Sequence, residues 1–546
     1  MLGGEEELPA ASAAIQFAYT GRVQPGISVR EALQVRQQAA YLLLDGCVEA
    51  CVEVIRGALV QGSAGSGSLA ATACAAASGS GSVAATTGAA AAGSGNAAAT
   101  TFAAAAGSGS AAATAVAAAA GSGNAAAAAS AAAAGSGNAT AATTGAAAAG
   151  SGNATAATTG AAAAGSGNAA VLELYSCAAL WPDPAENAAF AALLTEAKRR
   201  MVAHFGDALA VLNNKERYEQ MVALPAVGLE ALLESDDFGT DSESSVVLLL
   251  AEWMAANHAS TDEALRRRLC GLLRLAQCSR AYLAGVLPVL AARHQRSPAS
   301  AAGWFPMSVT EATCMLAYST ASEPERKAMS AEGQAWGPCA GMATMPVGWR
   351  NTQPRRQRLP ADGRSFDFSA GLTEMEKSFG ALKPGEEGLL YPRLPGSRLG
   401  DVVVAQGLEW QPFMKWVSGA STAGVFASPR EPAALAATAA SRTAAAEGEL
   451  LTGAVAAVPR MRLSVSGAAG QHSWSGRYDA AAVVRIWCGW GWAEALKLHE
   501  AATNQQPNGS NGTGSNVNSK LAARWAPYLQ GGTRLEGSMV LLPPAS

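Results

Sequence analysis

The stretch that decides the fold runs from Val222 to Phe238 and reads Val-Ala-Leu-Pro-Ala-Val-Gly-Leu-Glu-Ala-Leu-Leu-Glu-Ser-Asp-Asp-Phe. Ser242 follows at an N-cap position, with the acidic Glu243 in the first turn, and this arrangement is typical of a helix start. Apolar residues then recur at helical spacing, at Val246, Leu249, Leu250, Trp253 and Met254. We therefore predict helices that share a buried apolar stripe.

The same helical pattern extends to both sides of this stretch. Upstream, one apolar face comprises Phe190, Leu194, Ala197 and Met201. Downstream, the pattern returns at Leu265, Leu269, Leu272 and Leu273. Residues 171–330 are therefore predicted to form an all-α region. Near the start of the chain, residues 32–42 and 48–55 have helical spacing and are separated at Asp45-Gly46, which predicts a helical hairpin.

A low-complexity repeat separates these two helical regions. Gly-Ser-Gly followed by Asn or Ser recurs every 14 and then every 15 residues, with mostly Ala and Thr between the markers. A stacked repeat needs an apolar face that its neighbour can bury, and these units offer mainly methyl groups. We predict a disordered, flexible insertion over residues 61–170; an ordered repeat is the alternative.

After about residue 360, glycine and proline become frequent and the apolar residues alternate with polar ones, as in half-buried strands. Residues 361–546 are predicted to form an antiparallel β-sandwich with loops at 432–447 and Asn504–Ser519. Strands are expected at Val402–Ala405, Ala423–Ala427, Arg460–Val465, Ala481–Trp487 and Gly537–Leu542. The whole chain is thus predicted to be an α+β multidomain protein.

Residues 331–360 are expected to link the helical region to the sandwich. They carry a compact basic cluster of Arg355, Arg356 and Arg358. This cluster is interpreted as solvated linker charge, with a weak nuclear address as the alternative.

Charge and cysteine usage limit the function classes. The formal net charge of −4 provides no positive field for phosphates, so nucleic acid is not expected as a partner. No apolar run is long enough to cross a bilayer, so we expect a soluble protein. Nine scattered cysteines with no CxxC pair indicate a reducing compartment. Cys47 and Cys51, one helical turn apart, are expected to be buried; a metal site is the alternative.

Three motifs resemble known families. Ile-Gln-Phe-Ala-Tyr-Thr-Gly-Arg-Val from Ile15, followed by segments at Val29–Leu33, Gln38–Leu44 and Cys47–Cys51, resembles the C-terminal half of a BTB/POZ domain, in which Tyr-Thr-Gly is expected at a strand end. Val222–Phe238 with Ser242-Glu243 and Trp253 resembles the BACK domain. Gly491-Trp492 and Tyr528-Leu529 in the β-region resemble the MATH-like end of plant-type BTB/BACK proteins.

The resemblance implies the domain order: a BTB domain without its front half at 1–60, the insertion, a BACK-like domain at 171–330, a linker and a MATH-like sandwich at 361–546. It also implies a cullin 3 type partner, an unidentified substrate protein and a possible homodimer, in the cytoplasm or nucleus. Family members contact cullin through the first helical pair after BTB, which corresponds to Val171, Leu172, Leu174 and Tyr175. Helix-hairpin core is the alternative for these residues.

Three tryptophans of the β-region, Trp487, Trp490 and Trp492, alternate with glycines. They are interpreted either as sandwich core or as a stacking surface for a partner, and Trp490 and Trp492 are the predicted substrate-facing residues.

The sequence contains no constellation typical of catalysis. It has no Gly-x-Ser-x-Gly elbow, and its five histidines stand apart from one another. Asp236 and Asp237 precede a helix start, where carboxylates complete the turn; paired catalytic carboxylates are the alternative. We therefore predict a non-catalytic adaptor of a cullin 3 ubiquitin ligase with no metal and no cofactor. A scaffold or defunct paralogue that does not recruit cullin is the alternative.

Overall fold

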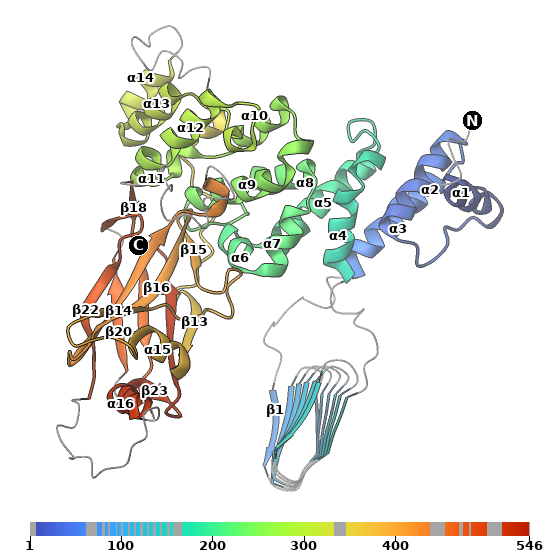
Figure 1. Cartoon of the computed structure of the whole chain (residues 1–546). Helices are drawn as coiled ribbons and strands as arrows, with labels where there is room; N and C mark the ends of the chain where they lie inside the picture. The colour runs from blue at the N-terminus through green and yellow to red at the C-terminus, as the bar shows by residue number, and fades with distance from the viewer. Residues whose placement is uncertain are drawn as a thin grey trace. The chain divides into compact units, whose positions relative to one another are not determined.

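The computed structural model describes the backbone of residues 7–61, of the strands between 74 and 156, and of residues 166–331, 345–436, 454–468, 473–479, 482–499 and 516–544. The chain divides into two compact units, Met1–Leu193 and Leu194–Ser546, whose elements are labelled in Figure 1. The first unit holds helices and the alanine-rich tract, and the second begins with helices and ends in antiparallel sheets. This is the α+β multidomain layout that the sequence predicts.

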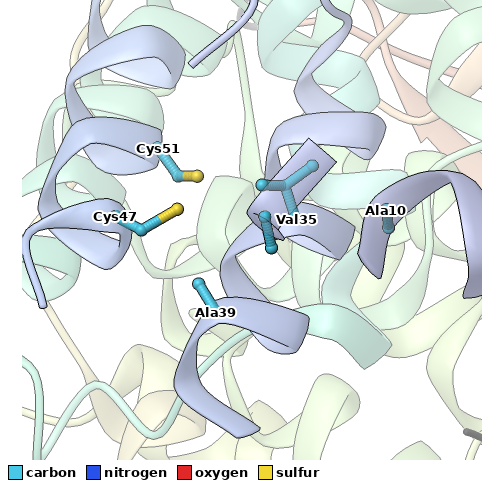
Figure 2. Close-up of a cluster of buried hydrophobic side chains, with 6 residues drawn as sticks. Ala10, Val35, Ala39, Cys47 and Cys51 are labelled. Carbon is cyan, nitrogen blue, oxygen red and sulfur yellow. The ribbon is translucent and has the colours of Figure 1, made fainter. Parts of the chain in front are cut away.

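The first unit packs short helices together, and one of its core clusters consists of small side chains. Its helices are α1 (Leu8–Thr20), α2 (Val29–Tyr41), α3 (Cys47–Gln61), α4 (Ser166–Ser176) and the start of α5 (Ala188–Phe205). Figure 2 shows the thiols of Cys47 and Cys51 on the side of α3 that faces Val35 and Ala39 of α2. Both thiols are buried and free, and α2 and α3 form the predicted hairpin.

Helix α4 follows the alanine-rich tract in sequence but packs on α2 and α3, which precede the tract. The Glu173 carboxylate accepts hydrogen bonds from the backbone N–H groups of Val29 (3.4 Å) and Arg30 (3.1 Å) in the first turn of α2. Ser28 and Glu31 form a capping box at the same helix end. Because a carboxylate satisfies the unpaired N–H groups at a helix N-terminus, Glu173 fastens α4 to α2.

The expected strand end at Tyr19-Thr20-Gly21 is instead the end of helix α1. Gly21 has a φ of 66°, and its N–H bonds to the Phe17 carbonyl oxygen at 2.7 Å. Glycine is favoured at this left-handed position because it has no Cβ. The prediction was wrong because the segment before Ile15 is rich in alanine, which favours helix. Ala10 and Ala14 of this helix are buried in the core of the first unit.

Between residues 74 and 156 the structure has twelve short strands in two parallel sheets, which differs from the disordered, flexible insertion predicted for residues 61–170. The odd-numbered strands are β1 (Cys74–Ser78), β3 (Gly88–Gly93), β5 (Phe102–Gly107), β7 (Val116–Ala120), β9 (Ser130–Ala134) and β11 (Gly145–Ala149). The even-numbered strands are β2 (Ser82–Ala85), β4 (Asn96–Ala99), β6 (Ser110–Ala113), β8 (Asn124–Ala127), β10 (Asn138–Ala141) and β12 (Asn153–Ala156).

Each 14- or 15-residue repeat contributes one strand to each sheet, and equivalent positions pair in register, as Asn124, Asn138 and Asn153 do. The reason for the difference is that backbone hydrogen bonds between repeats need no large apolar side chain. Residues 62–73 and 157–165, with the turns between strands, lie outside the described residues.

The helical half of the second unit confirms the helices predicted on both sides of Val222–Phe238. It continues α5 with α6 (Ala208–Asn213), α7 (Lys215–Val222), α8 (Ala226–Glu234), α9 (Glu243–Asn257), α10 (Glu263–Gly271), α11 (Arg280–Gly285), α12 (Leu287–Arg296), α13 (Val309–Thr320) and α14 (Glu323–Ser330). Ser242 caps α9, whose residues from Glu243 to Met254 are all buried, so α9 is a central core helix. Trp253 donates its indole N–H to the Leu224 carbonyl oxygen at 2.9 Å.

Residues 345–360 do not form the solvated linker that the sequence predicts. Trp349, in the 3-10 turn Val347–Arg350, is buried and donates to the Cys270 carbonyl oxygen at 2.8 Å. The Arg355 side chain is 0% exposed, and its Nε lies 3.0 Å from Oε2 of Glu243. Solvated linker charge is therefore wrong for Arg355, because this guanidinium neutralises a carboxylate that α9 buries. Residues 332–344 of the expected linker lie outside the described residues.

Two antiparallel sheets form most of the β-region. One is ordered β13-β24-β19-β20 with β23 on β24, and the other β14-β16-β17-β22 with β15 on β16. The first contains β13 (Arg364–Gly371), β19 (Met461–Val465), β20 (Trp474–Tyr478), β23 (Leu529–Gln530) and β24 (Arg534–Leu541). The second contains β14 (Glu387–Leu390), β15 (Val403–Ala405), β16 (Leu408–Val417), β17 (Thr422–Arg430) and β22 (Trp490–Lys497).

The β-region also contains a two-stranded ribbon and two helices. They are β18 (Val455–Ala457), β21 (Val483–Arg485), α15 (Leu372–Phe379) and α16 (Asn516–Trp525). The predicted loop Asn504–Ser519 is wrong at its end, because α16 begins at Asn516; residues 504–515 lie outside the described part. Of the other predicted loop, residues 432–436 hold a short 3-10 turn, and 437–447 are not described.

Buried polar pairs connect the helices of the second unit to its sheets. Asn213 of α6 donates from Nδ2 to the Val404 carbonyl oxygen (2.9 Å) and accepts from the Val404 N–H (2.7 Å). Arg364 of β13 holds both carboxylate oxygens of Asp207, the N-cap of α6, at 3.0 and 2.6 Å. Such two-point pairing fixes orientation as well as distance, so the two halves of this unit are joined through defined contacts.

Candidate partner-binding surface

Aromatic side chains gather on one face of the sheet that contains β16 and β17. Side chains alternate between the two faces of a strand, and Trp410 and Met414 are fully buried on one side of β16. Phe413 takes the opposite side and pairs across the ladder with Phe426. Their rings stack at 5.2 Å, and Tyr391 lies 5.8 Å from Phe413. A continuous row of rings therefore covers the face turned away from Trp410.

Glycines in β17, in β22 and just before β22 make room for this row. A Cβ on Gly489 would stand 2.4 Å from the Phe413 ring, and a Cβ on Gly424 would stand 2.4 Å from the Phe426 ring. A Cβ on Gly491 would stand 2.1 Å from the Val425 carbonyl oxygen. Real Cβ atoms do not approach so closely, so glycine at these positions lets the two phenylalanines lie flat on the sheet.

Arg430 extends the row toward Trp487. Its guanidinium carbon lies 5.5 Å from the Tyr391 ring centre and 5.7 Å from the Trp487 ring centre. Both distances are in the range of cation–π attraction. Trp487 has a φ of 71°, a backbone conformation that is costly for a bulky side chain. Its N–H bonds to the Pro429 carbonyl oxygen at 2.8 Å, which holds the tryptophan beside Arg430.

We call Tyr391, Phe413, Phe426, Arg430 and Trp487 the aromatic surface. Trp487 is 56% exposed and Tyr391 is 44% exposed, so two large rings of this surface are accessible to solvent. Tyrosine, tryptophan and arginine are the residue types enriched at the energetic centres of protein interfaces. The arrangement offers apolar contact and cation–π or hydrogen-bond recognition, which are the interactions of a binding surface.

Trp490 and Trp492, the predicted substrate-facing residues, lie on the other side of the sheet. They pair with the buried Ala427 and Val425 across the ladder. The Trp492 ring contacts Tyr478 of the other sheet at 4.6 Å, in agreement with the sandwich-core alternative. Trp490 is 47% exposed and stays accessible, but it is separated from the aromatic surface by the sheet.

The predicted cullin-facing residues lie in α4. Val171, Leu174 and Tyr175 are buried within the first unit, and Leu172 is half-buried. Tyr175 stacks edge-on against Trp181 at 5.4 Å, and the Trp181 indole N–H donates to the Leu174 carbonyl oxygen. Their observed contacts are those of the helix-hairpin core alternative.

The two aspartates considered as a catalytic pair each form an ion pair with an arginine. Asp236 pairs with Arg274 and Asp237 with Arg356. Burial raises the pKa of the Cys270 and Cys278 thiols, which keeps them protonated and poorly nucleophilic. Within the described ranges, no three His, Cys, Asp or Glu side chains gather closely enough to hold a metal ion. His472 lies outside those ranges.

The sequence shows the glycine–tryptophan alternation, but it does not show which aromatic rings lie against the glycines. The signal for the aromatic surface was available in Gly489 and Gly491, because glycine in a strand marks a close approach of neighbouring groups. The rings that approach are Phe413 and Phe426, which are distant in sequence. The strand register pairs Phe426 with Gly491, and the Phe413 ring lies against Gly489.

Comparison with known families gives one match. Residues 181–287, about a fifth of the chain, match the family model of BACK, described as BTB And C-terminal Kelch. The match supports a BTB/BACK-type protein and lies inside the BACK-like region that the sequence predicts. No curated protein matches the chain. None of the helices in the described part has the length and apolar character needed to span a membrane.

Proposed function

We propose that this chain is a non-catalytic substrate-recognition adaptor of a cullin 3 type E3 ubiquitin ligase. The observation that carries the proposal is the BACK match at residues 181–287, because BACK domains are typical of cullin 3 adaptors. The BTB/POZ resemblance at residues 15–59 and the MATH-like resemblance of the β-region are consistent with it. In this role the chain supplies proximity between a ligase and its substrate, and no bond chemistry.

The contacts inside the second unit support an adaptor mechanism. The aromatic surface belongs to the same compact unit as α6 to α14, and the pairs Asn213–Val404 and Asp207–Arg364 join the two halves. A protein bound on the aromatic surface would therefore be held at a defined position relative to these helices. We propose the aromatic surface as the substrate-facing region, in place of Trp490 and Trp492.

We further propose that the adaptor works in the cytoplasm or the nucleus. No disulfide joins the described cysteines, Cys47, Cys51, Cys177, Cys270, Cys278, Cys314 and Cys488, which is consistent with a reducing compartment. A fluorescent fusion of the full chain, imaged in living cells, tests the compartment. Signal confined to the secretory pathway would contradict it.

Direct binding to cullin 3 tests the proposed function. Purified full-length chain is titrated against purified cullin 3 by biolayer interferometry, and the same sample is sized by light scattering to read the homodimer. We expect saturable binding with a Kd of about 10 µM or tighter. Absence of binding at about 100 µM would reject the adaptor role.

A scaffold that does not recruit cullin is the second candidate. The observation that favours it is the burial of Val171, Leu174 and Tyr175, since these are the residues that the family resemblance assigns to cullin contact. In the same titration, loss of cullin 3 binding together with retained partner binding at the aromatic surface would identify the scaffold.

The aromatic surface is tested by comparing two exposed tryptophans. Trp487→Ala removes a ring from the surface, whereas Trp490→Ala removes a ring of similar exposure from the other side of the sheet. We expect quantitative affinity purification to lose partners with Trp487→Ala, by about tenfold for a centre of binding energy. Trp490→Ala should keep those partners. Equal loss with both variants would contradict this assignment.

A further inference from the structure

Strand β13 has a free edge that its own sheet does not use. It is the terminal strand of the order β13-β24-β19-β20 and pairs with β24 on one side only. On its other side, Ser369 exchanges two backbone hydrogen bonds with Arg393, both at 2.8 Å. This single bridge shows which residues of β13 point their backbone groups away from β24.

The alternation of an antiparallel ladder extends this assignment along the strand. Backbone N–H and C=O groups of successive residues point to opposite edges. Since those of Ser369 point outward, those of Asp367 and Ser365 also point outward, and those of Phe366 and Phe368 bond to β24. The described contacts contain no backbone partner for the outward groups of Ser365 and Asp367.

The chain's own sequence explains why pairing stops after Ser369. The next residue that would oppose β13 is Pro395, two positions after Arg393. Proline has no N–H to donate to a ladder. A turn follows, closed by the bond from the Ser397 N–H to the Leu394 carbonyl oxygen at 2.9 Å, and it carries the backbone away. The edge at Ser365–Asp367 is thus left open.

This open edge lines a groove of about 560 Å³. Other lining residues come from the α6–α7 corner, including Asn213, Asn214 and Arg217, and from Pro395. The volume is within the range of binding pockets, about 300–1,000 Å³. The groove therefore combines unpaired strand backbone with side chains from the BACK-matching helices.

The groove contains a cation and a carboxylate that do not pair with each other. Arg217 bonds to the Phe205 carbonyl oxygen at 3.4 Å, and none of the described carboxylates forms an ion pair with it. Arg364 is neutralised by Asp207. The exposed Asp367 carboxylate accepts a hydrogen bond from the Ser365 hydroxyl at 3.3 Å and forms no ion pair with a described residue. A ligand that matches this pattern carries a carboxylate opposite Arg217 and a cation opposite Asp367.

We propose that the groove binds an extended segment of a partner protein, which adds to β13 as a further strand and presents an acidic side chain to Arg217 and a basic one to Asp367. Strand addition satisfies the outward N–H and C=O groups of Ser365 and Asp367, and neighbouring side chains give the specificity. The site is separate from the aromatic surface and does not depend on cullin binding.

Hydrogen exchange of the free full-length chain tests the open edge. The amides of Ser365 and Asp367 exchange quickly, and those of Phe366 and Phe368 are protected by β24. Protection of all four amides in the free protein would overturn the proposal, because the edge would already be paired.

A displayed library of random peptides of about ten residues, longer than a typical strand, is the probe for the occupant. Selected peptides are expected to contain acidic and basic residues and to slow the exchange of the Ser365 and Asp367 amides. N-methylation at every second peptide position should abolish binding, and N-methylation at the positions between should not. Failure to select any peptide, or N-methyl effects without this period, would overturn strand addition.

Variants locate the peptide on the edge. Asp367→Pro removes an N–H that the ladder to β24 does not use, so the fold tolerates it. Asp367→Ala removes the same carboxylate and keeps the N–H. We expect Asp367→Pro to weaken peptide binding by about tenfold or more, and Asp367→Ala by about threefold or less. Equal effects of the two variants would contradict a backbone-paired ligand, and a thermal melt of each variant confirms folding.

Charge reversal tests the polarity of the occupant. Arg217→Glu is expected to shift the library toward basic residues at the position that is acidic with the natural chain. Unchanged selection would remove Arg217 from the site. Concentration-dependent self-association that Asp367→Pro abolishes would assign the edge to a second copy of this chain and overturn the proposal of a different partner.

Discussion

The helical and the β halves of the second unit close their backbone hydrogen bonds over very different sequence distances. In α9, bonds connect residues four apart, and the apolar residues that define the helix are neighbours in sequence. In the sheets, Arg364 of β13 pairs with Leu541, and Phe426 of β17 pairs with Gly491. Local pattern therefore predicts helices and strands, whereas the faces that form a surface depend on register.

The buried ion pair that joins residues 345–360 to the helices gives the largest expected effect. Arg355→Met leaves the Glu243 carboxylate buried without its cation, and removing one partner of a buried pair costs about 3–5 kcal/mol. The adjacent Arg356→Met is the control, because its pair with Asp237 is more than 60% exposed on both sides and is worth about 0–1 kcal/mol.

Denaturant unfolding of both variants, followed by tryptophan fluorescence, measures this difference. Equal midpoints for Arg355→Met and Arg356→Met would show that the pair with Glu243 is not buried in solution. The sequence-based interpretation of these arginines as one solvated cluster would then be restored.

Arg355 and Arg356 show that the sequence does not predict which arginine of a cluster is buried. Ser242, Glu243 and Trp253 predicted α9 because capping and apolar spacing are local signals. Nothing local distinguishes Arg355 from Arg356, since the partner of Arg355 stands 112 residues away. The expected strand at Tyr19 failed for another reason: Ile15 and Tyr19 suit strands as well as helices, and the alanines before them decided the outcome.

Gly489→Ala is the next prediction and concerns the aromatic surface. Its Cβ would stand 2.4 Å from the Phe413 ring, so the ring must move, at a cost of about 1–3 kcal/mol. Gly396→Ala is the control for stability, because a Cβ there meets nothing within 4 Å. The free energy of unfolding of the two variants is compared. Partner affinity is measured for Gly489→Ala alone, because Gly396 lines the groove beside β13. An unchanged Gly489→Ala variant would show that Phe413 does not lie flat on the sheet.

The candidate surface was predictable only in part, for the same physical reason. The glycine–tryptophan alternation drew attention to Trp490 and Trp492, but the nearest predicted strand, Ala481–Trp487, ends before β22, and alternation alone does not say which face is inner. Contact with Tyr478 makes the Trp492 side the inner one, and Phe413 then lies on the other side. The free edge of β13 was not predicted either. The sequence does not show the pairing of Ser369 with Arg393, which Pro395 ends.

The N-cap of α13 gives a smaller effect in the helical half. The Ser308 hydroxyl accepts from the Glu311 N–H at 3.1 Å and forms a capping box. Ser308→Ala is expected to lower the free energy of unfolding by about 1 kcal/mol. Ser319→Ala in the same helix removes a hydroxyl that is not a cap and should stay within about 0.5 kcal/mol. Equal effects would contradict a specific capping contribution.

The smallest expected effect is the pH dependence of a surface pair on α5. Hydrogen bonding from Arg199, aided by Arg200, lowers the pKa of Glu196 to about 2. A carboxylate whose folded pKa lies below its unfolded value of about 4.3 stabilises the fold above that value, and the contribution disappears as pH falls through the folded pKa. The Glu196 side chain is 34% exposed, so solvent limits the pair to about 0.3–0.5 kcal/mol.

Glu196→Gln removes the charge and keeps the shape of this side chain. The free energy of unfolding of the natural chain should exceed that of Glu196→Gln near pH 7, and the difference should narrow as pH falls from about 5 to about 3. Lys198→Gln is the matched comparison, because its partner Glu234 lies on α8, across a contact between helices. A difference that widens in acid would mean that Glu196 is stabilised in its protonated form, and the local pairing inferred for α5 would be wrong.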